Sequence, residues 1–63
     1  MPSFKRLCEI IVSTNGNPTV KEVLECGYTM EHFIRMCQHN CNTDILVQKA
    51  QESLNKMNNK EVV

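Results

Sequence analysis

The sequence lacks three features that would each point to a particular class of protein. It carries no net charge, because seven Lys and Arg residues balance seven Asp and Glu residues, and the interspersed charges form no basic run of the kind that binds nucleic acid. Its longest apolar runs, such as Ile10–Val12, have three residues, whereas a membrane-spanning helix needs about 20. The first residues, MPSFKRL, hold no secretory signal pattern. We therefore expect an intracellular protein, in the cytoplasm or nucleus, with no membrane partner.

Motifs of the common catalytic sites are also missing. The sequence has no Gly-rich phosphate loop, no paired-carboxylate motif and no nucleophile elbow. The residue types allow a cysteine nucleophile, Cys37 or Cys41, with a nearby histidine as its base. A chain of 63 residues, however, buries only about 60% of its unfolded surface and has little room for a substrate cavity. We expect a protein that is not an enzyme and uses no cofactor.

Four cysteines are present in this short chain: Cys8, Cys26, Cys37 and Cys41. In a secreted protein they would suggest two disulfides, and the segment Cys37-Gln38-His39-Asn40-Cys41 also contains residue types that bind zinc. On a helix, however, His39 points about 200° round from Cys37. Each cysteine follows the apolar stripe of a helical pattern, so we expect free thiols in the core, with disulfides and a metal site as the alternatives.

Hydrophobic residues recur at helical spacing along the chain and predict an all-α fold. We expect one domain over residues 1–63, a compact bundle of three to four short helices. Ser3 is suited to cap a first helix over residues 3–12. A turn-rich segment, residues 13–18, leads to a second helix, at which Thr19 and Glu22 have the spacing of a capping box. The apolar faces of these two helices are expected at Phe4, Leu7, Cys8 and Ile11, and at Val20, Val23 and Leu24.

Two further helices are predicted. Thr29 is placed to cap the third, and a fourth begins at about Asp44 after an interruption at residues 40–43. The tail, residues 58–63, is expected to fray. The third helix should turn inward Met30, Phe33, Ile34, Cys37 and Cys41, and the fourth Leu46 or Val47, Ala50, Leu54 and Met57.

The corner between the second and third helices, Glu25-Cys26-Gly27-Tyr28-Thr29-Met30-Glu31, carries a family resemblance. Residues 19–50, about half of the chain, resemble the ubiquitin-associated domain family and its CUE relatives. That family has Met-Gly-Phe or Met-Gly-Tyr at this loop. Gly27-Tyr28 matches it, and Cys26 replaces the methionine. The apolar pair Phe33-Ile34 and Asn42 at the start of the last helix also match, whereas Val47 and Gln51 stand where the family usually has alanine and leucine.

The resemblance implies a three-helix ubiquitin-binding module, with residues 19–54 as its core and residues 3–12 as an additional helix. It also implies the residues that bind the protein partner: Cys26, Gly27, Tyr28 and Thr29 in the loop, with Leu54 near the end of the last helix. The alternative for Tyr28 is structural, because an aromatic residue directly after a helix-ending glycine often folds back on its own helix in a Schellman-type cap.

Two other functions remain open from the sequence. The second and third helices could form a DNA-binding helix-turn-helix with residues 30–38 as the recognition helix, although its outward residues, Thr29, Glu31, His32 and Arg35, include a single firm cation. A core this small also favours a homodimer through leftover apolar surface. The candidates for that surface are Ile10, Val12 and Met36.

Overall fold

Four helices form the regular structure of residues 2–59, and the all-α prediction is confirmed. The computed structural model describes residues 2–59, and for Asn59 the backbone alone. Within these residues no strand occurs, and no helix is long and apolar enough to cross a membrane. The helices are α1 (Phe4–Ser13), α2 (Val20–Glu25), α3 (Met30–His39) and α4 (Thr43–Asn59).

The helix starts follow the predicted caps. The Ser3 hydroxyl accepts a hydrogen bond from the Arg6 backbone N–H at 3.2 Å, and the Thr29 hydroxyl accepts one from the His32 N–H at 3.1 Å. At α2 the capping box is complete, because Glu22 N–H donates to Thr19 Oγ1 at 3.2 Å and Thr19 N–H donates to Glu22 Oε1 at 2.8 Å. The Thr19 backbone N–H, and then its hydroxyl, lower the pKa of Glu22.

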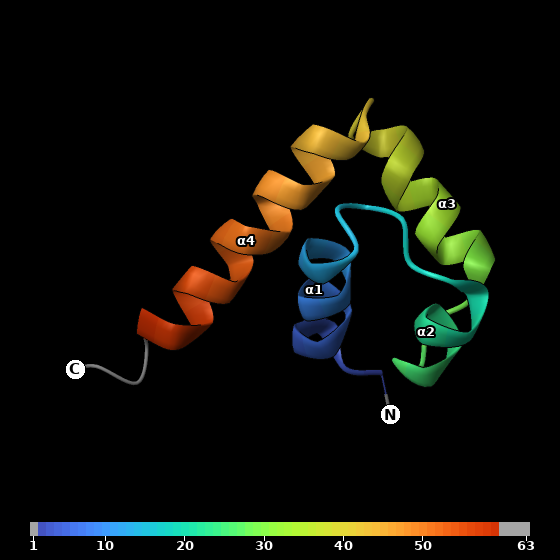
Figure 1. Cartoon of the computed structure of the whole chain (residues 1–63), viewed down its shortest axis with the longest axis horizontal. Helices are drawn as coiled ribbons and strands as arrows, with labels where there is room; N and C mark the ends of the chain where they lie inside the picture. The colour runs from blue at the N-terminus through green and yellow to red at the C-terminus, as the bar shows by residue number, and fades with distance from the viewer. Residues whose placement is uncertain (1, 60–63) are drawn as a thin grey trace.

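The helices form a flattened arrangement with α1 at its centre. In Figure 1, α3 and α4 slope apart from a shared apex, α1 lies between them beside α4, and α2 lies against the lower part of α3. The apex is a tight turn in which Cys41 has a left-handed φ of 71° and Asn42 Oδ1 caps α4 by accepting from Ile45 N–H at 2.9 Å. The extents of 36 × 26 × 17 Å are those of a layer little thicker than one helix and its side chains.

Helix α1 supplies the largest share of the core. The nine buried hydrophobic residues are Leu7, Cys8, Ile10, Ile11, Val23, Cys26, Phe33, Leu46 and Ala50, of which the first four belong to α1. A backbone hydrogen bond from Ser3 N–H to the Cys26 carbonyl, 2.9 Å long, also ties the start of α1 to the end of α2. Residues 3–12 therefore contribute a central part of the core.

Several residues assigned to inward faces from their periodicity are exposed. Val20 and Leu24 are each 55% exposed and Ile34 is 50% exposed. The reason is that α2 has only six residues and turns Val23 alone into the core, while Phe33 takes the core position on α3. Cys41 is exposed because α3 ends at His39, before the apex turn.

Three further predictions need correction. Ile10, expected to offer leftover surface for a dimer, is only 4% exposed, and Val12 and Met36 are half-buried and packed against the core. Of the expected tail 58–63, Asn58 and Asn59 continue α4, and residues 60–63 lie outside the described residues.

The connector from α1 to α2 packs against the start of α4. Its backbone takes positive φ at two successive residues, 54° at Asn15 and 87° at Gly16, and Gly16 N–H donates to the Ile11 carbonyl at 2.8 Å. Gly16 is buried, and a Cβ atom placed on it would lie 3.0 Å from Thr43 Cβ and 3.4 Å from Val47 Cγ2. The connector thus approaches α4 as closely as a glycine allows.

Candidate functional site

The corner between α2 and α3 is a Schellman cap. Gly27, with φ of 89°, donates its N–H to the Leu24 carbonyl at 3.0 Å, and Tyr28 N–H donates to the Val23 carbonyl at 3.4 Å. These two bonds close the last turn of α2 in the Schellman pattern. The corner is therefore a rigid connection whose shape is set by α2 itself.

Tyr28 has both a structural and an exposed side. Its ring is half-buried and packs against the core, as the hydrophobic contact of a Schellman cap requires. The ring centroid also lies 5.1 Å from that of His32, with the planes tilted by 45°, and His32 itself is exposed. The corner thus presents part of an aromatic ring supported from behind by the core.

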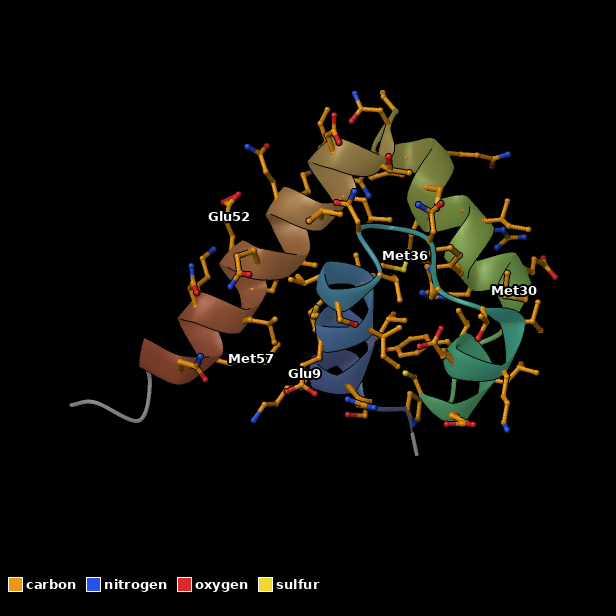
Figure 2. The ribbon with its side chains drawn as sticks, in the orientation of Figure 1. Glu9, Met30, Met36, Glu52 and Met57 are labelled. Carbon is orange, nitrogen blue, oxygen red and sulfur yellow. The ribbon has the colours of Figure 1, made fainter. Side chains whose placement is uncertain are left out.

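The structure brings together only some of the predicted binding residues. Gly27 and Thr29 are exposed beside Tyr28, but Cys26 is 2% exposed and its side chain cannot reach a partner. Leu54 is half-buried on α4. It lies in the stretch of α4 between Glu52 and Met57, which Figure 2 places across α1 from the corner end of α3, marked by Met30. Leu54 therefore does not form one surface with the corner.

Exposed hydrophobic side chains concentrate on the two helices that flank the corner. Among residues 2–58, four large hydrophobic side chains are about half exposed, namely Phe4, Val20, Leu24 and Ile34, and three of them belong to α2 or α3. Val20 and Leu24 are one helical turn apart and share one face of α2. We refer to Val20, Leu24, Gly27, Tyr28, Thr29 and Ile34 as the corner surface.

A groove between α1, α3 and α4 is the second candidate site, and the sequence did not predict it. Its volume is about 580 Å³, within the range of roughly 300–1,000 Å³ typical of ligand sites. Helices α3 and α4 each contribute residues at i, i+3, i+4 and i+7, and α1 contributes residues at i, i+4 and i+7. The lining residues are Phe4, Cys8 and Ile11 from α1, His32, Arg35, Met36 and His39 from α3, Asn40 after it, and Leu46, Lys49, Ala50 and Ser53 from α4.

The groove combines an apolar floor with a rim that carries basic residues and no acidic one among its lining residues. Cys8, Ile11, Leu46 and Ala50 are buried at its base, and Figure 2 shows Met36 between α3 and α1. Arg35 and Lys49 are on the rim with two histidines. The nearest described ionic partner of Arg35 is Glu31, on the same helix at 2.8 Å, and both side chains are 76% exposed.

One polar atom of the groove lining has no hydrogen-bond partner. Asn40 is 9% exposed, and its side-chain N–H donates to the Met36 carbonyl at 2.7 Å. Its Oδ1 atom is buried, and no described group donates to it. Leaving a buried acceptor unsatisfied costs about 1–3 kcal/mol, and Asn40 Oδ1 is such an acceptor among the described side chains.

The cysteines divide into two pairs. All four are free: Cys8 and Cys26 are buried, Cys37 is half-buried and Cys41 is exposed. Burial raises the pKa of Cys8, with a smaller contribution from Glu9, and burial raises the pKa of Cys26. Among the described residues, no three His, Cys, Asp or Glu side chains lie close enough together to hold a metal ion.

This division predicts unequal thiol reactivity. Treatment of the folded protein with iodoacetamide near neutral pH should modify Cys41 first, whereas Cys8 and Cys26 should react about 100-fold more slowly, because they need an opening motion and carry less thiolate. Peptide mass mapping with time gives the rates, and unfolding in urea should equalise them. A chelator should leave the helical circular dichroism unchanged. Cys8 reacting as fast as Cys41, or loss of helix with chelator, would contradict the prediction.

No family model, curated protein or solved structure matches the chain. The resemblance of residues 19–50 to ubiquitin-associated domains therefore stays a hypothesis that rests on Gly27-Tyr28 and its neighbours.

Proposed function

We propose that this protein is a non-enzymatic protein-interaction module that binds its partner through the corner surface. The observation that carries the proposal is the exposure of Val20, Leu24 and Ile34 on the two helices that flank the corner. Isolated exposed hydrophobic residues are ordinary, but a concentration of them marks an interaction site. The Schellman cap holds this surface in one shape, so that little order has to be gained on binding.

Ubiquitin is the first partner to test. The resemblance of Gly27-Tyr28 to the family's binding loop supports this choice, and so does the exposure of Gly27 and Thr29 beside Tyr28. Leu54 lies elsewhere, so the contact would be limited to the corner surface. A contact of this size falls in the weak, transient class, below about 1,200 Å² of total buried area.

The test is a titration of the isotope-labelled protein with ubiquitin, followed through its backbone amide resonances. The amides of Leu24, Gly27, Tyr28 and Ile34 should shift. Replacement of Leu24 or Ile34 with serine should weaken binding by tenfold or more, as at an interface hot spot of about 1.4–2 kcal/mol. Both side chains are about half exposed, so the free energy of unfolding should fall by about 1 kcal/mol or less. Gln48→Ser, exposed on α4, is the matched control.

Tyr28→Ala is expected to weaken binding and to lower stability as well, because its ring also packs on the core. Unfolding curves recorded for this variant give its loss of stability, so that the loss of binding affinity can be assessed separately. Absence of shifts at the corner up to millimolar ubiquitin, or unchanged affinity in Leu24→Ser and Ile34→Ser, would count against the proposal. Sedimentation velocity should accompany the titration, because the same surface is the candidate contact of a homodimer.

The helix-turn-helix function is the alternative, favoured by the two helices joined through the four residues 26–29. The outward side chains of α3 oppose it, since Glu31 pairs with Arg35 and would face phosphates. The same spectra recorded with duplex DNA decide the matter: shifts at Thr29, His32 and Arg35 with DNA, and none with ubiquitin, would favour this alternative.

A further inference from the structure

We infer that the groove between α1, α3 and α4 is a second binding site, which accepts the apolar face of an acidic amphipathic helix from a partner protein. This site is separate from the corner surface. The two sites meet along one side of α3, where His32 contacts the Tyr28 ring and Arg35 directly follows Ile34 in the chain.

The position of the nitrogen donors on the rim indicates an elongated acidic partner. His32, Arg35 and His39 lie at i, i+3 and i+7 on one side of α3, which spreads them over about 10 Å at 1.5 Å per residue. Lys49 stands on the opposite wall, on α4. A single carboxylate, as in a fatty acid, would reach one end of this row. A helix with acidic residues on both flanks of its apolar face could reach both walls. Even a neutral histidine can donate one N–H to such a residue.

The apolar floor matches the other face of such a helix. Cys8, Ile11, Leu46 and Ala50 line the groove and are at most 4% exposed, so a partner would contact them only through the tips of inserted side chains. Phe4, 47% exposed, extends the apolar surface at one end. Recognition of a helix through a few anchor side chains in an apolar groove is a recurrent mode of binding.

The cost of opening the rim is small. The Glu31–Arg35 pair is highly exposed, and exposed ion pairs contribute little to stability. Arg35 can therefore exchange Glu31 for an acid of the partner. The acidic side chain of Glu52, on α4, points away from α1 in Figure 2, so it would not repel an acidic ligand in the groove.

The proposal is tested with a synthetic peptide of about 18 residues that has leucine at i, i+3, i+4, i+7 and i+11, one serine beside the leucines, and glutamate at the other positions. Its matched control has lysine in place of every glutamate. Binding should shift the amides of Leu46, Lys49 and Ala50. The side-chain NH₂ resonances of Asn40 report directly from inside the groove and should shift too. The lysine peptide should leave all of them in place.

Charge reversal supplies the second readout. Lys49→Glu should weaken binding of the acidic peptide by tenfold or more and reduce its dependence on salt. Lys21→Glu, the same change at an exposed position on α2, should leave the affinity within twofold. Lys49→Glu should leave ubiquitin binding unchanged, and Ile34→Ser should leave peptide binding unchanged, so that the two proposals fail separately.

Three results would overturn the inference. The first is a lack of groove shifts with the acidic peptide. The second is an equal loss of affinity in Lys21→Glu and Lys49→Glu, which would show non-specific charge attraction. The third is groove shifts with dodecanoate below its micellar concentration and none with the peptide, which would make the site one for a small anionic amphiphile.

Discussion

Replacing Leu7 with alanine should leave much of the protein unfolded at physiological temperature. The Leu7 side chain is completely buried at the centre of the core, and such truncations cost about 2–5 kcal/mol. A core in a chain below about 70 residues rarely supplies more than roughly 3–5 kcal/mol of total stability, so this one change removes most of it. Urea unfolding followed by circular dichroism measures the effect.

Phe4→Ala is the matched control for Leu7→Ala. Phe4 lies one turn earlier on the same helix and is the larger side chain, but it is 47% exposed, so its removal should cost about 1 kcal/mol or less. A peptide of residues 17–59, which lacks α1, should show no cooperative unfolding. Cooperative unfolding of that peptide, or equal losses in the two variants, would mean that α1 is an accessory to an independent unit formed by the other helices.

Gly16→Ala is expected to lower stability by about 2–3 kcal/mol. The left-handed backbone at Gly16 costs roughly 1–2 kcal/mol for an L-residue, and the added Cβ would lie 3.0 Å from Thr43 Cβ, so the connector or α4 must shift. The free energy of unfolding in urea measures the loss. Asn15→Gly is the control, because Asn15 also has positive φ and glycine accepts that conformation freely.

The steric and backbone contributions at Gly16 can be separated. Thr43→Gly removes the nearest atom, so a double-mutant cycle of Gly16→Ala with Thr43→Gly isolates the contact between the connector and α4. If the double variant is about 1 kcal/mol more stable than the sum of the two single losses predicts, the connector is in steric contact with α4. A Gly16→Ala variant as stable as the starting protein would contradict the close approach described above.

Helix starts and ends were predictable because they depend on a few neighbouring residues. Ser3, Thr19 with Glu22, Thr29 and Gly27 each act within one turn, and side chain to backbone bonds at that range follow from residue type. The fold class followed from the same local patterns.

Which apolar residues would be buried was less predictable. Periodicity identifies a face, but the packing partner decides how much of it is covered. The helical spacing assigned both Phe33 and Ile34 to the inward face of α3, yet only Phe33 is buried in the core. The position of Leu54 depends on the direction of α4, which packs along α1. The family resemblance covers residues 19–50 and does not include α1, so it could not predict that direction.

The groove could not have been found from any one segment. Its lining combines α1 with α3 and α4, which lie much later in the sequence, and the residues from each helix alone form an ordinary amphipathic stripe. One signal was available in the sequence. Asn40 is a polar residue, and its spacing of seven residues from Phe33 and four from Met36 places it on the same helical face as these two. A buried polar residue at such a position is informative.

The packing of α1 along α4 has a consequence for how the chain folds. All of residues 14–42 lie between these two helices, so their contact closes a long loop, and the entropy of that closure has to be lost before the central core gives any return. The α2–α3 pair can form its Schellman cap early but has little to pack against until then. The relative contact order of the whole chain is therefore higher than that of a bundle whose helices pack only on their neighbours in sequence. Proteins with a higher relative contact order fold more slowly.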